Sequence, residues 1–209
     1  MSQKKRGRKI SPKRSQDHFG KRAKREGKPA RSYYKLEEMD EKFQLLKSGM
    51  SVLDLGCSPG AWLMYAYKKV GEKGRVIGYD LKPVEVALPA YAQARIGDVF
   101  EVNDFGVGSG FDVVLSDMAP ATTGSRDVDG LRSATLVERA LYLAEKNLKP
   151  GGHFVAKLLE SGEIEGLMRS LRAKFTKVCR ARPKATRRES TEVFLVAMGM
   201  KKLGVSDVS

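Results

Sequence analysis

The sequence predicts one α/β domain with a doubly wound, mostly parallel sheet of seven strands and helices on both faces. Two observations predict this class. Short apolar segments of strand type alternate with helical patterns along most of the 209 residues, and several segments end on an aspartate. The last two strand segments are joined by residues 181–190, which are too few for a parallel crossover, so we expect an antiparallel seventh strand.

The elements are expected where hydrophobic spacing and turn residues agree. Residues 34–46 have helical spacing, Gly71 ends the second helix, and Pro150 and Gly151 end the third. The expected helices are residues 31–46, 62–70, 132–147 and 163–174. The expected strands are residues 51–55, 74–80, 94–97, 111–117, 153–158, 175–180 and 191–198.

Positive charge is concentrated at the N-terminus. The net charge is +14, and residues 1–31 hold 13 of the 39 lysines and arginines against two acidic residues. A basic arm beside a nearly neutral domain indicates a polyanionic partner, most simply nucleic acid. A solvated arm is the alternative, and an anionic membrane fits less well because the arm lacks a bulky apolar face. We expect a flexible RNA-binding arm (1–29), one domain (30–199) and a tail (200–209).

Several classes of protein are disfavoured. Cys57 and Cys179 are far apart, and His18 and His153 are isolated, so we expect neither a disulfide nor a metal site. No apolar run reaches the roughly 18 residues of a membrane span, and no apolar core follows the basic N-terminus as in a secretory signal. The expectation is a cytoplasmic monomer without a metal.

Residues 52–62 form the most informative stretch, in which a buried strand, a glycine turn and the start of a helix follow one another. Such a turn lets a ligand approach the backbone at the carboxyl end of a strand. Acids fall at the ends of this strand and of three later ones: Asp54, Asp80, Asp98 and Asp117. Asp80 is at the position where an acid can accept hydrogen bonds from ribose hydroxyls. The spacing of Gly56 and Gly60 is not GxGxxG and a Walker A motif is absent, which argues against NAD, FAD and nucleoside triphosphates.

Three residues of this stretch allow two interpretations each. Asp54 either binds the ligand or only fixes the turn. Trp62 either packs against the ligand or belongs to the core. Cys57 is more typical of a small apolar filler than of a nucleophile.

The glycine turn and the aspartates that follow it resemble the class I S-adenosylmethionine-dependent methyltransferases. That resemblance implies that the turn approaches the methionine and ribose parts of the cofactor. It also implies that Asp80 holds the ribose hydroxyls and that Asp98 accepts from the adenine amino group.

Four further segments, read with the cofactor turn, resemble the RrmJ/FtsJ (RlmE) family of ribosomal RNA 2′-O-methyltransferases. They are ARSYYKL (30–36), LSDMAP (115–120), FVAK (154–157) and STEVF (190–194). The resemblance extends over about residues 16–199, and the turn departs from the commoner PGGW only at Ala61. It implies a catalytic tetrad of Lys35, Asp117, Lys157 and Glu192. The cofactor-binding residues that the turn and the family imply are Gly56, Gly60, Trp62, Asp80, Asp98 and Asp117.

The reaction implied by the family is methylation of a ribose 2′-hydroxyl, that of a uridine in 23S ribosomal RNA of the large subunit. A hydroxyl is a poor nucleophile until its proton is removed, so the enzyme must align an in-line displacement and handle that proton. Lys157 is the candidate base. Ordinary lysines are protonated at pH 7, so this role needs burial and a second cation, Lys35, to favour the neutral amine. Alternatively, Lys157 stays charged and steers the hydroxyl.

A second basic stretch between the last two strands is expected to form an RNA groove together with the arm. Its members are Arg180, Arg182, Lys184, Arg187 and Arg188. A solvated loop is the alternative. Tyr33 and Tyr34 could stack on bases, although the helical spacing of Tyr34 favours the core.

Two other functions remain open from the sequence. One is a methyltransferase that acts on transfer RNA or an mRNA cap, which the lack of an appended recognition domain disfavours. The other is a non-catalytic RNA-binding assembly factor, which the complete tetrad disfavours.

Overall fold

The computed structural model describes residues 18–102 and 110–202. Its strands are β1 (Ser51–Leu55), β2 (Arg75–Asp80), β3 (Ala92–Ile96), β4 (Phe111–Ser116), β5 (Leu148–Leu159), β6 (Phe175–Ala181) and β7 (Glu192–Met200). Its helices are α1 (His18–Arg25), α2 (Ser32–Phe43), α3 (Ala61–Val70), α4 (Arg126–Asn147) and α5 (Ile164–Lys174). Within these residues, no helix is long and apolar enough to cross a membrane.

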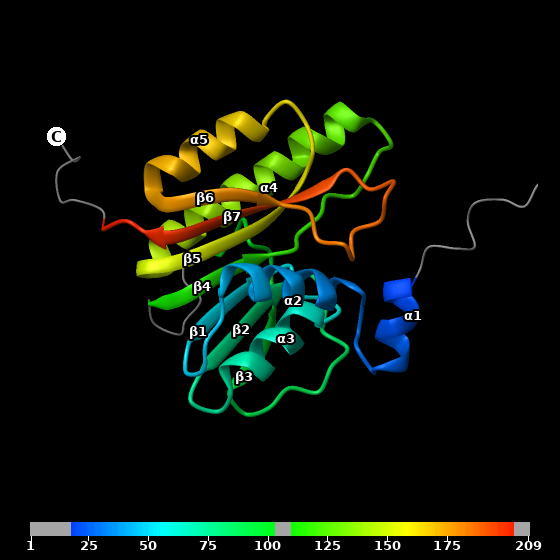
Figure 1. Cartoon of the computed structure of the whole chain (residues 1–209), viewed down its shortest axis with the longest axis vertical. Helices are drawn as coiled ribbons and strands as arrows, with labels where there is room; N and C mark the ends of the chain where they lie inside the picture. The colour runs from blue at the N-terminus through cyan, green and yellow to red at the C-terminus, as the bar shows by residue number, and fades with distance from the viewer. Residues whose placement is uncertain (1–17, 103–109, 203–209) are drawn as a thin grey trace, which may run out of the picture.

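The strands form one seven-stranded sheet in the order β3-β2-β1-β4-β5-β7-β6, with α2 and α3 over one face and α4 and α5 over the other (Figure 1). All neighbours from β3 to β5 are parallel, whereas β7 runs antiparallel to both β5 and β6. The predicted fold class is therefore confirmed. Because the chain returns from the edge strand β3 to β4 beside β1, the crevice for a ligand lies at the carboxyl ends of β1 and β4.

The central strands are buried on both faces, which explains their nearly continuous apolar sequences. Leu53 and Leu55 of β1 pack into the core under α4 and α5. Val52, which alternates with them, packs into the core under α2 and α3. The carboxyl end of β1 is thus held rigidly between two packed layers.

Several element boundaries differ from the prediction. Helix α2 ends at Phe43 rather than residue 46, because Gln44 adopts φ 56° and its N–H closes back onto the Asp40 carbonyl. Strand β3 begins two residues and ends one residue earlier than predicted. Strand β5 begins at Leu148 and continues through the expected turn, where its pairing with β4 shifts as in a β-bulge.

Helix α4 begins at Arg126, well before the predicted start at residue 132. The Asp129 carboxylate accepts hydrogen bonds from the N–H groups of Thr123 and Gly124, at 2.7 and 3.1 Å. These bonds join the first turn of the helix to the backbone of the residues just before it.

Helix α1 occupies part of the arm that was predicted to be flexible. Its Ala23 is buried, and the ring of Phe19 lies 5.7 Å from that of Tyr34 on α2. Arg22 stacks over the same tyrosine, whose hydroxyl donates to Glu26 at 2.8 Å. These contacts dock residues 18–26 onto the domain, while residues 1–17 of the predicted arm lie outside the described residues.

Candidate active site

A cavity of about 820 Å³ lies at the carboxyl ends of the parallel strands, as expected for this topology. Its volume is within the range of small-molecule sites. Its walls come from the turn after β1, from the ends of β2 and β3, and from the segment after β4. The predicted site residues that line it are Gly56, Asp80, Asp98 and Asp117.

The two carboxylates beyond β2 and β3 are fixed by backbone N–H groups. Asp80 accepts from Ser58 on one oxygen and from Lys82 on the other, each at 2.9 Å. Asp98 accepts from Phe100 at 2.9 Å. A carboxylate offers about four lone-pair positions, so both side chains keep acceptor positions for donors of a ligand. Ribose hydroxyls and an exocyclic amino group are donors of this kind.

The cavity also has apolar walls. Leu81 and Phe100 line it and are 68% and 49% exposed, which is unusual for large apolar side chains. Val99, Met118 and Pro120 line the same space. Apolar walls with a few fixed polar groups are typical of sites for flat, aromatic ligands. The cavity therefore fits a nucleoside.

The two glycines of the turn allow close packing between segments. A Cβ on Gly56, which has φ 78°, would lie 2.6 Å from Met118 Cγ and 3.0 Å from its backbone. A Cβ on Gly60, which has φ 111°, would lie 2.5 Å from Val86 Cγ2. Gly56 lines the cavity, but Gly60 does not. Gly60 instead lets the β2–β3 connection pack on the turn.

Trp62 lies in the core, which agrees with one of its two interpretations, and it is not among the residues that line the cavity. Only 2% of its surface is exposed, and its ring centroid lies 5.7 Å from that of Phe194 on β7. Its indole N–H donates to the Ser32 carbonyl at 2.9 Å, so it joins α3 to the start of α2. Cys57 is buried as well, and burial raises the pKa of its thiol, as expected of a filler.

Asp54 and the two tyrosines are also buried. Asp54 does not line the cavity, and among the described residues neither of its carboxyl oxygens has a hydrogen-bond partner. Neither a bond to the turn nor a position in the cavity wall is therefore seen for it. Tyr33 and Tyr34 belong to the core under α2 and α3, so stacking on bases is not open to them.

The four residues of the implied tetrad come together as two ion pairs. Lys157 Nζ lies 2.9 Å from Asp117 Oδ1 and donates to the Asp117 carbonyl at 2.6 Å. Lys35 on α2 and Glu192 at the start of β7 form the second pair, whose side chains are almost fully buried. Because Asp117 also lines the cavity, the Lys157–Asp117 pair lies at the cavity wall.

The two pairs influence each other electrostatically. Burial alone would raise the pKa of Glu192, but the nearby cations Lys35 and Lys157 lower it below its usual range. Glu192 is therefore ionised at neutral pH. Two cations and two carboxylates balance in a small buried volume, which explains how four ionisable side chains are tolerated there.

The second basic stretch has a fixed shape that the sequence did not reveal. Arg182 donates to the carbonyls of Arg187, Arg188, Ser190 and Glu192, so its guanidinium is used inside the loop. Glu38 on α2 accepts from the N–H groups of Lys184 and Ala185, at 2.7 and 3.1 Å. Lys184, Arg187 and Arg188 are exposed on this loop. No sequence signal pointed to Glu38.

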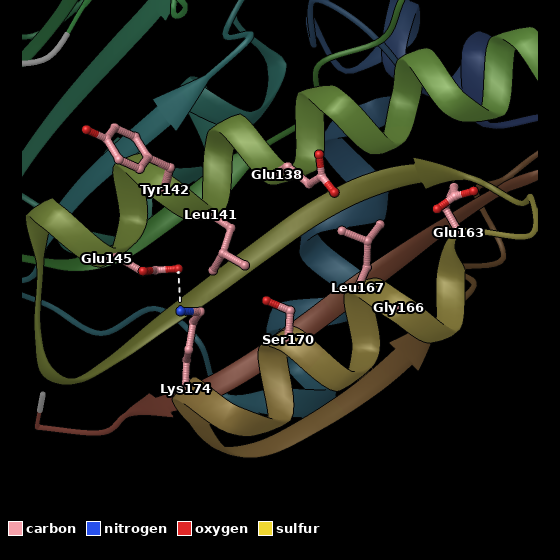
Figure 2. A pocket seen from close by; sticks show the side chains of 9 residues that line it. All are labelled: Glu138, Leu141, Tyr142, Glu145, Glu163, Gly166, Leu167, Ser170 and Lys174. Carbon is pink, nitrogen blue, oxygen red and sulfur yellow. Dashed lines mark ion pairs between the residues drawn. The ribbon is translucent and has the colours of Figure 1, made fainter. Parts of the chain in front are cut away.

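A second hollow of about 270 Å³ lies between α4 and α5, away from these residues (Figure 2). Figure 2 shows its main charged contact, the ion pair of Glu145 and Lys174 at 3.1 Å. It contains no predicted site residue. The site at the strand ends is therefore the candidate active site.

A cavity at the carboxyl ends of a seven-stranded sheet of this order is typical of the methyltransferases that use S-adenosylmethionine, and the chain is an enzyme of this class. S-adenosylmethionine is its cofactor, as the sequence predicted. More specifically, the chain belongs to the FtsJ-like methyltransferase family, whose model matches residues 29–200.

Relatives and solved structures agree with this assignment. The chain is 44% identical to ribosomal RNA large subunit methyltransferase E of Desulforapulum autotrophicum, over 95% of this chain and 100% of that protein. It is 45% identical to the protein of the same name from Desulfatibacillum aliphaticivorans, over 100% and 99% of the two chains. A Plasmodium falciparum protein, provisionally named a ribosomal RNA methyltransferase, has a similar crystal structure, with a TM-score of 0.72 and 25% identity over 82% of this chain and 98% of that one.

Proposed function

We propose that this chain methylates a ribose 2′-hydroxyl, that of a uridine, in 23S ribosomal RNA of the large subunit. The relatives named as large-subunit methyltransferases support the substrate. The observation that carries the proposal is the position of Asp117, which lines the cavity and pairs with Lys157. Methyl donor and acceptor hydroxyl can therefore meet beside one residue. We place this activity in a cytoplasmic monomer.

The residues of the cavity fit the cofactor. We assign the ribose hydroxyls to Asp80 and the adenine amino group to Asp98, because both keep free acceptor positions. The apolar walls at Leu81, Val99 and Phe100 would lie against the adenine ring. When bound, S-adenosylmethionine supplies a methyl group that its sulfonium has already activated.

The tetrad handles the proton of the acceptor hydroxyl. We assign Lys157 as the proton acceptor and Asp117 as the residue that orients it, through the carboxylate and the carbonyl. Accepting a proton requires the neutral amine of Lys157 at that step, and Lys35 places a second cation near the same carboxylate, Glu192. Glu192 holds Lys35 in place. In this way the hydroxyl oxygen gains nucleophilic character as it approaches the methyl group.

RNA is proposed to bind on the basic surfaces beside this site. The exposed cations of the β6–β7 loop, Lys184, Arg187 and Arg188, lie on the segment that leads into Glu192. The Lys/Arg-rich N-terminal arm adds further charge. Contacts of this kind to phosphates are strong at low salt and weaken as salt rises.

The test is methyl transfer from labelled S-adenosylmethionine to large-subunit particles. We expect label on a ribose 2′-oxygen, located by mass spectrometry of nuclease fragments. Substituting Lys157→Ala should lower the rate by about 10²–10⁴-fold. Lys73→Ala, a change of an exposed lysine between α3 and β2, is the matched control and should keep the rate. Label on a base or on transfer RNA, or an unchanged rate in Lys157→Ala, would contradict the proposal.

A further inference from the structure

Arg139 on α4 binds the backbone of a loop that forms part of the wall of the cofactor cavity. Its Nε donates to the carbonyl of Val99 at 2.7 Å, and one terminal nitrogen donates to the carbonyls of Phe100 and Val102, at 3.2 and 2.7 Å. Val99 and Phe100 line the cavity, and Asp98 precedes them. One half-buried side chain thus binds three of the carbonyls of the 98–102 loop.

The loop itself is a single tight turn organised around Asp98. The N–H groups of Glu101 and Val102 donate to the Asp98 carbonyl, at 3.1 and 3.2 Å, and the N–H of Phe100 donates to its carboxylate. These bonds direct the later carbonyls of the turn toward α4. Several carbonyl oxygens that face the same way can be bound by one side chain only if it has several N–H donors. The guanidinium group of arginine provides such donors in a fixed geometry.

We propose that Arg139 is a positioning residue for cofactor recognition, which sets the Asp98 carboxylate and the Phe100 side chain at the adenine end of the cavity. This inference rests on the proposed contact between Asp98 and the adenine amino group. Arg139 does not line the cavity, so it acts only through the loop. Its effect should therefore appear in cofactor affinity and in discrimination of the base.

The structure offers a matched control on the same helix. Arg139 and Lys146 both place a cation over the ring of Tyr142, at 5.0 and 5.1 Å from its centroid. Among the described residues, Lys146 forms no hydrogen bond to the 98–102 loop, and its side chain is exposed. Lys146→Met therefore removes an equivalent cation–π contact and leaves the loop bonds in place.

The experiment measures binding of S-adenosylhomocysteine to the full-length chain by calorimetry. We expect Arg139→Met to raise Kd about tenfold and Arg139→Lys, which keeps one donor group, to raise it less. Lys146→Met should leave Kd unchanged. In turnover, the KM for S-adenosylmethionine should rise in Arg139→Met, while kcat at saturating cofactor and the KM for RNA stay near those of the parent.

A second ligand separates positioning from a general loss of structure. The purine analogue of S-adenosylhomocysteine lacks only the 6-amino group, so the parent should bind it more weakly than the adenosyl compound. In Arg139→Met this preference should shrink, whereas partial unfolding would weaken both ligands equally. An undiminished preference or an unchanged Kd in Arg139→Met overturns the role of Arg139. Absence of a preference in the parent overturns the Asp98 contact instead.

Discussion

Asp54 is the buried ionisable residue of the site that the proposed chemistry does not use. Its carboxyl is fully buried, and its oxygens have no hydrogen-bond partner among the described residues. Burial raises its pKa well above the usual value, and the charges of Asp117 and Asp80 raise it further. Both causes favour the neutral form of the Asp54 carboxyl at the end of β1.

The raised pKa of Asp54 predicts a pH-dependent cost to folding. The stability that the neutral acid contributes is complete below the unfolded pKa of about 3.9, and it is lost as pH rises toward the raised folded value. Asp54→Asn removes this ionisation. Relative to the parent, the free energy of unfolding of this variant should therefore rise with pH above pH 4. The difference should grow by up to about 1.4 kcal/mol for each pH unit.

Urea denaturation of both proteins at several pH values between 5 and 7 would measure this difference. The exposed Asp127→Asn on α4 is the control, because that change should follow the parent at every pH. Parallel stability curves for Asp54→Asn and the parent would show that Asp54 is ionised in the folded protein.

Motif reasoning grouped side chains that lie together in the structure, but it did not predict their local surroundings equally well. The resemblance placed Lys35, Lys157, Asp117 and Glu192 in one tetrad, and these residues do meet as two ion pairs. The indole of Trp62, in contrast, donates to the Ser32 carbonyl at the start of α2. The direction of this side chain therefore depends on a helix outside the motif. A local motif carries no information about such a neighbour.

At the scale of elements, the β6–β7 loop is anchored to the helix that carries Lys35. Glu38, one turn further along α2, binds two backbone N–H groups of this loop. Arg182 holds the carbonyls on the loop's other side. The loop is thus fixed relative to both Lys35 and Glu192 before any RNA arrives.

We predict that Glu38→Ala releases this loop. Its two charge-assisted hydrogen bonds are partly exposed, so the loss should cost about 1–3 kcal/mol of unfolding free energy. Amide exchange at Lys184 and Ala185 should become faster, and the KM for RNA should rise several-fold with cofactor affinity unchanged. Glu41→Gln, a change of an exposed acid on the same helix, is the control. Unchanged exchange at Lys184 would contradict the anchoring role.

The order and type of the predicted elements were right because periodicity and strand-end aspartates are local signals. The predicted boundaries were wrong where a side-chain contact to the backbone, or a contact with a distant segment, determines where an element begins or ends. Helix α4 starts early because Asp129 binds the preceding backbone, and β5 extends through Pro150 as a bulge against β4. Glu38 and Arg139 escaped prediction for the same reason, since both bind backbone groups of segments remote in sequence.

At the scale of the whole molecule, the basic N-terminal region has two different parts. Residues 1–17 carry seven lysines and arginines and one acid. Helix α1 carries further basic residues, but its Ala23 is buried and its Phe19 ring packs against that of Tyr34. The first part should act through charge alone, and the second should also contribute to stability.

Two deletions separate these roles. Removing residues 1–17 should weaken RNA binding and reduce its dependence on salt, because fewer counterions are released, while thermal stability and S-adenosylhomocysteine binding stay the same. Removing residues 1–28 should cause the same loss and also lower the free energy of unfolding by about 2 kcal/mol, since Tyr34 loses its cover. A chain with the seven cations of residues 1–17 changed to glutamine is the control for length, and it should match the shorter deletion. If the shorter deletion lowered cofactor affinity as much as RNA affinity, residues 1–17 would have to belong to the catalytic domain rather than to an RNA-binding arm.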